Sequence, residues 1–250
     1  MRSDNPVAVV TGGTGGIGAA TAKALAVAGF CVAVGFRRSP AAAQSLAAGL
    51  SGAGHIAVSA RVNDSMALRA MAAEIAERYA RCDVLVNCAG TTRFVPHGDL
   101  DGLDDALIDE ILTTNVRGSF AAVRALLPLL RESTRPGGAV VINVSSIAAR
   151  TAMGSNIMYC ASKAALDNMT RSLARALAPA VRVISVSPGL VDTEFVKSLD
   201  SAWRDSQAAR TPLGRLASTA EVAAAVVAAV RDLTFTTGCV LSVDGGRPLN

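Results

Sequence analysis

Short apolar runs alternate with longer helix-like stretches along almost the whole chain. The runs are rich in β-branched residues, which favour strands, and they lie at residues 7–10, 31–36, 55–59, 83–88, 139–145, 181–187 and 239–243. The stretches between them have about the length that a βαβ crossover requires, so connected strands should be parallel and the crossovers right-handed. This pattern predicts a single α/β domain over residues 1–250, a doubly wound seven-stranded parallel sheet with helices on both faces.

The alternation is interrupted most clearly at residues 190–217. Residues that break any simple pattern there are Asp192, Thr193, Glu194, Trp203 and Pro212. A long connection beyond the carboxyl end of a strand is a typical place for a substrate lid. An ordinary surface helix is the alternative, but the position favours a lid.

Composition excludes several broad classes of protein. Hydrophobic residues make up 51% of the chain and charged residues 18%, which is unlike a disordered or highly charged protein. The net charge of +4 comes from scattered basic residues and aromatic residues are only 4%, so we expect no nucleic-acid partner. Because no apolar run approaches the roughly 20 residues that span a bilayer, and no signal-peptide core is evident, we expect no membrane partner.

The cysteines point to a reducing compartment. Their number is odd and their spacing shows no paired metal motif: Cys31, Cys82, Cys88, Cys160 and Cys239. Most lie in or beside predicted strands, so we expect reduced thiols in a cytoplasmic protein without a metal site.

A glycine-rich loop follows the first apolar run. The chain reads Thr11-Gly12-Gly13-Thr14-Gly15-Gly16-Ile17-Gly18, and a helix-like stretch follows to Gly29. In the order strand, glycine turn, helix, the glycines let the backbone approach a pyrophosphate, and the helix N-terminus attracts its charge. A glycine-rich loop without a ligand is the alternative. The flanking elements favour a dinucleotide site that includes Thr11, Gly12, Thr14, Gly16, Ile17 and Gly18.

Tyr159 and Lys163 stand four positions apart in the run Tyr159-Cys160-Ala161-Ser162-Lys163. On a helix they share one face, with Cβ atoms roughly 5–6 Å apart. A cation at about 4 Å in an effective dielectric near 20 favours an ionised phenol by ~4 kcal/mol, enough to allow proton transfer near neutral pH. Ser146 lies thirteen positions upstream, at the end of an apolar run. Taken alone, the pair has an alternative interpretation, a half-buried aromatic beside a solvated lysine.

Together these residues resemble the short-chain dehydrogenase/reductase family, over nearly the whole chain. Its cofactor signature T-G-x-x-x-G-x-G is matched by Thr11, Gly12, Gly16 and Gly18, and its Asn-Asn-Ala-Gly by Asn87-Cys88-Ala89-Gly90, with one substitution. Its remaining motifs are matched by Asn115, by Ser146 with Tyr159 and Lys163, by Pro188-Gly189 with Thr193, and by residues 237–246. Six motifs in order at family-like spacings make the match specific.

The resemblance implies a Rossmann fold with strand order 3-2-1-4-5-6-7 and an enzyme that transfers a hydride from a nicotinamide cofactor to a ketone. Ser146 would hydrogen-bond the ketone oxygen, Tyr159 would donate the proton, and Lys163 would assist Tyr159 and bind the nicotinamide ribose. Asn115 would hold a water that links Lys163 to solvent. Ser145 is the competing serine, and the thirteen-residue spacing selects Ser146. Further cofactor contacts are implied at Val62, Asn87, Ala89, Gly90, Pro188, Gly189, Val191 and Thr193.

The end of the second strand predicts the choice between NAD and NADP. An acidic residue there would bind the ribose hydroxyls of NAD, but the sequence reads Gly35-Phe36-Arg37-Arg38-Ser39. Arginine suits bidentate contact with a phosphate, so we expect NADP(H) to bind at Phe36, Arg37 and Arg38. Two solvated arginines are the alternative. Arg61 stands where the family commonly has an aspartate, so it either alters adenine recognition or adds positive charge near the 2′-phosphate.

The substrate site is expected to be apolar. Its candidate lining residues are Phe94, Ile147, Met153, Phe195 and Trp203, which favour an acyl group or another hydrophobic ketone over a free sugar. Within the family the chain looks most like bacterial 3-oxoacyl-carrier-protein reductases, so an acyl carrier protein is a candidate partner. The helix end at residues 176–181 lacks the basic residue often found in such reductases, although Arg131 and Arg135 offer an acidic partner something to bind. The alternative is a sugar, alcohol or steroid-type dehydrogenase of the same family.

Two further expectations concern the molecule as a whole. The helices that carry Tyr159 and Asn115, together with the C-terminal strand, resemble the family's subunit-pairing surfaces, so we expect a homotetramer with two-fold symmetries. A protein that binds NADP as a sensor or scaffold without turnover is a remote alternative. Such proteins usually lose the tyrosine or the lysine, and this chain keeps both.

Overall fold

The computed structural model describes residues 5–198 and 200–249 and contains a seven-stranded sheet in the order β3-β2-β1-β4-β5-β6-β7. The strands are β1 (Val7–Thr11), β2 (Cys31–Phe36), β3 (Ile56–Ser59), β4 (Val84–Asn87), β5 (Ala139–Val144), β6 (Val181–Pro188) and β7 (Val240–Val243). All neighbouring strands pair in parallel. The predicted fold class, strand order and strands are therefore confirmed.

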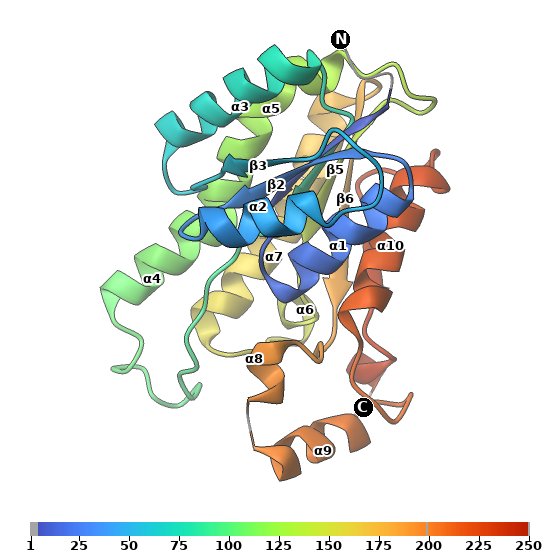
Figure 1. Ribbon diagram of the computed structural model, residues 1–250. Helices are drawn as coiled ribbons and strands as arrows, with labels where there is room; N and C mark the ends of the chain where they lie inside the picture. Colours follow the sequence, from blue (N-terminus) through green and yellow to red (C-terminus); the bar gives the residue numbers. More distant parts are fainter. Residues whose placement is uncertain (1–4, 199, 250) are drawn as a thin grey trace.

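Helices cover both faces of the sheet (Figure 1). One face is covered by α3 (Ser65–Tyr79), α5 (Ser119–Arg131) and α7 (Ile157–Leu177), and the other by α1 (Gly16–Val27), α2 (Pro40–Ala48) and α10 (Thr219–Arg231). The shorter elements are α4 (Asp105–Leu112), the π-helical turn η1 (Thr113–Gly118), α6 (Ala148–Thr151), α8 (Glu194–Lys197), α9 (Ser201–Ala209) and the 3-10 turn η2 (Arg247–Leu249).

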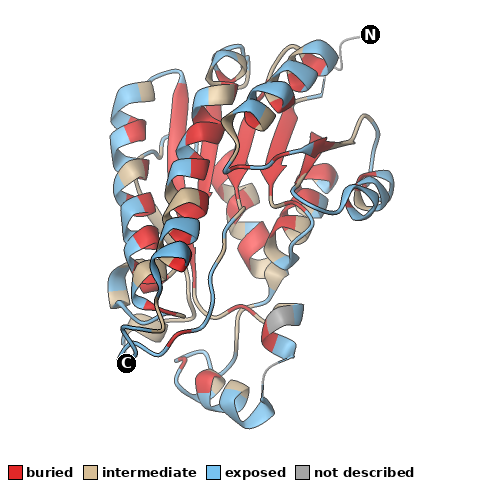
Figure 2. Ribbon diagram, turned by 90° about the vertical axis from the view of Figure 1, so that its left-hand side faces the viewer, coloured by how far each residue is buried: buried red, intermediate tan, exposed pale blue. Residues whose placement is uncertain are grey.

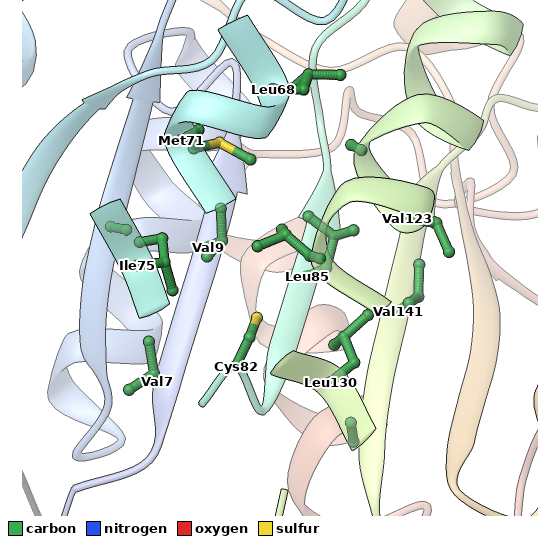
Figure 3. Close-up of a cluster of buried hydrophobic side chains, with 14 of the residues drawn as sticks. Val7, Val9, Leu68, Met71, Ile75, Cys82, Leu85, Val123, Leu130 and Val141 are labelled. Carbon is green, nitrogen blue, oxygen red and sulfur yellow. The ribbon is translucent and has the colours of Figure 1, made fainter. Parts of the chain in front are cut away.

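Alternate residues of each strand enter different cores. Val7 and Val9 pack with the side chains of α3 and α5, whereas Ala8 and Val10 pack under α1 and α10. Figure 3 shows the first of these cores, with Leu68 and Met71 of α3 lying over the sheet. Because both faces are covered, the central strands are buried along their length (Figure 2). This double burial explains why the strands are continuous apolar runs in the sequence.

The segment 190–217 forms a long connection beyond the carboxyl end of β6, as expected. It contains α8 and α9, which lie apart from the two helical layers (Figure 1). An ion pair of 2.8 Å between Asp192 and Arg204 joins its first part to α9. The position suits the predicted lid, and movement of this segment stays a prediction.

Candidate active site

The strand order places the glycine-rich loop where the direction of strand addition reverses. β1 pairs with both β2 and β4, and Thr11 lies opposite Asn87. In doubly wound sheets the crevice outside the carboxyl ends of such strands is the usual ligand site. The Thr11 hydroxyl connects the two loops that border this crevice, because it accepts hydrogen bonds from the N–H groups of Cys88 and Ala89, both at 3.2 Å.

Close packing of this loop requires its glycines. Gly12 has φ +63°, in the left-handed region, and a Cβ there would lie 2.8 Å from Cα of Ala89. A Cβ on Gly18 would overlap the carbonyl oxygen of Gly12, and one on Gly16 would lie 3.2 Å from the methyl group of Thr193. The loop therefore meets two other segments predicted to bind the cofactor.

The N-terminus of α1 fits the pyrophosphate that the motif predicts. No side chain of the described residues caps this end, its first turn contains no acidic residue, and Thr14, Gly15 and Gly16 are exposed. The first N–H groups of a helix have no intrahelical partner, and the helix dipole favours an anion beside them. The charge and the exposed backbone thus match a dinucleotide at this position.

Tyr159 and Lys163 lie in the first turns of α7, and Ser146 follows β5. Lys163 is only 6% exposed, and its ammonium donates a hydrogen bond of 2.8 Å to the carbonyl of Val144. Its nitrogen lies 5.6 Å from the centroid of the Tyr159 ring, on the shared helix face that the spacing predicts. An ammonium has three donors, so Lys163 keeps two for a ribose or a water.

The structure distinguishes the two adjacent serines. Ser145 is buried, and its hydroxyl donates to the backbone carbonyl of Lys163 at 3.4 Å. Ser146 is half-buried, and its oxygen accepts the N–H of Ala148 at 3.2 Å. Because this bond leaves the hydroxyl proton of Ser146 available, Ser146 is the better donor to a substrate oxygen.

Asn115 lies in η1, and its side chain makes three hydrogen bonds. Oδ1 accepts the N–H of Thr91 at 2.8 Å, while Nδ2 donates to the carbonyl of Thr91 and to the hydroxyl of Ser162, both at 3.1 Å. The side chain therefore fixes the loop after β4. The backbone carbonyl of Asn115 accepts the Ser119 hydroxyl at 3.0 Å, and the water that Asn115 is expected to hold for Lys163 stays a prediction.

The predicted 2′-phosphate site lies at the end of β2. Phe36 is half-buried and Arg37 and Arg38 are exposed. Neither arginine belongs to an ion pair found within residues 5–198 and 200–249. Arg61, in contrast, pairs with Asp64 at 3.2 Å. The charge of Arg61 is thus partly neutralised, while Arg37 and Arg38 keep theirs for an anion.

Two loops complete the expected cofactor site. Val62 is buried, and a Cβ on Gly118 of η1 would lie 2.9 Å from it. After Pro188, the N–H of Gly189 donates to the carbonyl of Val243 at 3.0 Å. Val191 is buried, and Thr193 caps α8 by accepting the N–H of Val196 at 3.3 Å.

Asn87, at the end of β4, is a further expected cofactor contact. Its side chain is buried, and its amide donates to Asn143 Oδ1 at 2.9 Å.

The candidate substrate residues are unevenly exposed. Phe94, Met153 and Trp203 are exposed by 73%, 57% and 40%, whereas Ile147 is buried. The side chain of Phe195 lies outside the described residues. His97 lines a pocket with Ile157, which stands two positions from Tyr159 and so on the other side of α7. Exposed apolar side chains at this edge suit a hydrophobic substrate, and their contact with it stays a prediction.

Asn156 has a place in the site that sequence reasoning missed. It lies directly before α7, and its Oδ1 accepts the N–H of Tyr159 at 2.7 Å. An asparagine immediately before a helix is a typical N-cap, so the sequence did contain a signal for this role.

Comparisons with known proteins point in the same direction. A family model described as "Enoyl-(Acyl carrier protein) reductase" matches residues 12–247. "Granaticin polyketide synthase putative ketoacyl reductase 2" of Streptomyces violaceoruber is 41% identical over 246 residues, which cover 98% of this chain and 96% of that protein. "Cis-4-hydroxycyclohexanecarboxylate dehydrogenase" of Sinomonas cyclohexanicum is 37% identical over 244 residues, covering 96% and 95%. A crystal structure of "a putative short-chain dehydrogenase/reductase from Burkholderia xenovorans" matches with a TM-score of 0.91 at 37% identity, covering 100% of both chains.

Proposed function

The chain belongs to the short-chain dehydrogenase/reductase family, a family of nicotinamide-dependent oxidoreductases, and we propose that it uses NADPH to reduce an apolar ketone to a secondary alcohol. The observation that supports this proposal most is the pairing of Tyr159 with the buried Lys163, whose ammonium binds the carbonyl of Val144, two positions before Ser146. Loss of either Tyr159 or Lys163 would favour a binding protein without turnover. Both residues are present. Lys163 is buried and lies on the same face of α7 as Tyr159.

Each residue has a separate task in the proposed reaction. The bound cofactor supplies the hydride that the carbonyl carbon accepts. Ser146 donates a hydrogen bond to the carbonyl oxygen, and Tyr159 delivers a proton as negative charge develops there. Lys163 keeps a positive charge beside Tyr159 and retains donors for the ribose. Asn115 keeps Thr91 in place through the two hydrogen bonds to its backbone.

NADP(H) is proposed over NAD(H) because of the charge at the end of β2. An acid at this place would repel a 2′-phosphate, but Arg37 and Arg38 follow Phe36 and are exposed. Charge-assisted bonds from arginine to phosphate are about twice as strong as neutral ones.

A 3-oxoacyl thioester or a similar ketone is the proposed substrate. The exposed apolar residues Phe94 and Met153 support it, as does the ketoacyl reductase named among the relatives. An acyl carrier protein is a proposed carrier, for which the name of the matched family model gives support. Oxidation of a secondary alcohol is the second candidate, supported by the relative named as a hydroxycyclohexanecarboxylate dehydrogenase.

The proposed location is the cytoplasm. Within the described residues the five cysteines form no disulfide, which is the state expected in a reducing compartment. Across the described residues, no helix combines the length and the hydropathy needed to cross a bilayer.

A substrate panel tests the proposal. NADPH absorbance is followed with a 3-oxoacyl thioester, a diketone, an enoyl thioester and a keto sugar, with NADH in parallel. We expect the oxoacyl thioester and diketone to be reduced fastest. The enoyl thioester should be inert, because the carbon that would accept the hydride has no oxygen for Ser146 and Tyr159 to bind. Faster turnover of the sugar would favour the alternative dehydrogenase. No turnover of any ketone would contradict the proposal.

A further inference from the structure

The buried amide of Asn156 connects two segments that are far apart in the sequence. Asn156 is 1% exposed, and its Oδ1 accepts the N–H of Tyr159 at 2.7 Å. Its Nδ2 donates to the hydroxyl of Thr92 at 3.2 Å and to the carbonyl of Arg93 at 2.7 Å. Both donors of the amide are therefore used. One side chain thus joins the first turn of the Tyr159 helix to the loop after β4.

Ser155 makes the same connection at a second point. Its carbonyl accepts the N–H of Val95 at 2.8 Å, and its hydroxyl lies 2.5 Å from that of Thr92. Residues 91–95, which we name the wall, are consequently held against the chain that leads into α7.

The wall extends from the reacting groups to the surface. Its first residue, Thr91, is bonded by Asn115, and a Cβ on the preceding Gly90 would lie 3.8 Å from the amine of Lys163. Near its other end, Phe94 is exposed. In the proposed reduction, the ketone approaches Tyr159 along this wall.

The N-cap role alone does not explain why residue 156 is an asparagine. A cap needs only a side-chain oxygen, and serine, threonine or aspartate would serve as well. The two N–H donors of Asn156 add nothing to the cap, yet both are buried and bonded to the wall. Their effect is to fix the distance between the wall and Tyr159, and a displacement of about 1 Å can cost an enzyme 10²-fold in rate.

We propose that Asn156 is a positioning residue that holds the wall relative to Tyr159 and so determines which face of the substrate carbonyl is presented for reduction. This inference rests on the proposed ketone reduction. The chemistry stays with Ser146 and Tyr159, and Asn156 acts through the geometry of the wall.

Asn156→Ser tests the inference, because serine keeps a capping oxygen but cannot span to the wall. Thr92→Ala is the second variant, since it leaves the cap unchanged and removes one bond to Asn156. For Asn156→Ser we expect unchanged NADPH affinity, a Tm lowered by only a few degrees, and ~10-fold faster hydrogen exchange at the Val95 amide, the change expected for ~1.4 kcal/mol of lost hydrogen bonding. We also expect a lower enantiomeric excess of the alcohol formed from ethyl 3-oxobutanoate and a ~10-fold lower kcat/KM.

The two variants should act through the same contact. Thr92→Ala should also speed hydrogen exchange at the Val95 amide and lower the enantiomeric excess of the alcohol. In the double variant, each change should be smaller than the sum of the changes in the two single variants. Wild-type exchange at Val95 in Asn156→Ser, or unchanged enantiomeric excess and kcat/KM, would overturn the inference. If the wild-type protein reduces no ketone, the proposed function fails, while the exchange measurement still decides whether Asn156 holds the wall.

Discussion

At the scale of single residues, polar side chains of the site are bonded to backbone groups of the protein itself. Lys163 binds the carbonyl of Val144, Asn115 binds both backbone groups of Thr91, and Asn156 binds the N–H of Tyr159. Removing one partner would leave a buried polar group unpaired, at a cost of about 1–3 kcal/mol. The reacting groups are thus preorganised, which is what electrostatic stabilisation of a transition state requires.

Arg37 is expected to determine the preference for NADPH over NADH. If Arg37 binds the 2′-phosphate, each charge-assisted hydrogen bond contributes about 1.5–3 kcal/mol, so kcat/KM should favour NADPH over NADH by at least ~10-fold. Phe36→Asp combined with Arg37→Ala should reverse this preference, because a carboxylate would bind the ribose hydroxyls and repel the phosphate. The measurement is kcat/KM with both cofactors for each protein.

The matched control for this prediction is Arg78→Ala, which removes an exposed charge from the far end of α3. Arg78→Ala should prefer NADPH over NADH to the same degree as the wild-type protein. A wild-type protein that prefers NADH would show that Arg37 and Arg38 are only surface charges.

Spacing along the sequence was sufficient to predict that Tyr159 and Lys163 lie on one face of a helix. Tyr159 and Lys163 needed only a helix to share a face, and a helix is a local structure. The engagement of Asn115 and Asn156 was not predictable, because their partners Thr91 and Arg93 lie 24 and 63 positions away. Such pairs are decided by the packing of loops, for which one sequence carries little signal.

At the scale of elements, α9 is tied to the loop that carries Thr193. Arg204 donates to Asp192 at 2.8 Å, and both side chains are about one-third exposed. A partly exposed pair contributes up to about 1 kcal/mol, so Arg204→Ala should raise KM for the ketone up to ~5-fold if this segment closes over substrate. Steady-state kinetics measure this change.

The control is Lys197→Ala, which breaks the exposed ion pair with Glu194. An equal effect of both variants on KM would argue against a specific role of the Asp192–Arg204 ion pair.

The start of α10 gives a prediction about pH. The Arg215 guanidinium and the N–H of Ser218 bind the Glu221 carboxylate and lower its pKa to about 2. A lowered pKa in the folded state contributes stability above the unfolded value of about 4.3, and this contribution is lost as pH falls toward 2. Glu221→Gln should therefore lower the urea midpoint at pH 7, with a difference from wild type that narrows below about pH 4.3. A difference that stays constant with pH would refute the prediction, and Glu77→Gln, on the exposed side of α3, is the control.

The boundaries of most strands could be predicted from the sequence, but the π-helical turn η1 could not. Its residues, Thr113–Gly118, continue directly from α4 into α5. One wider turn adds a single residue and leaves the general helical pattern intact. The turn matters because it contains Asn115, whose side chain holds the loop after β4.

At the scale of the whole molecule, the fold followed from the sequence because a parallel sheet covered on both faces requires continuous apolar strands. Assembly is a separate matter, since it depends on surfaces. Exposed Ala161 and Ala164 lie on α7, and Phe120 of α5 is 42% exposed. These small and apolar side chains support the proposed homotetramer.

Light scattering at micromolar concentration tests this assembly. We expect a mass four times the 25.4 kDa of the chain. Ala164→Arg should lower this mass because a long charged side chain would prevent close contact at α7. Ala70→Arg, on the exposed side of α3, should leave it unchanged, and a monomeric wild-type protein would contradict the expectation.

Tyr159→Phe removes the phenol that is proposed to donate the proton to a substrate carbonyl. The measurement is kcat with the best ketone of the panel, together with the Kd for NADPH by fluorescence titration. Because phenylalanine removes only the hydroxyl, we expect kcat to fall by about 10²–10⁴-fold while the Kd for NADPH stays close to that of the wild type. Turnover by Tyr159→Phe at the wild-type rate would show that Tyr159 is not the proton donor.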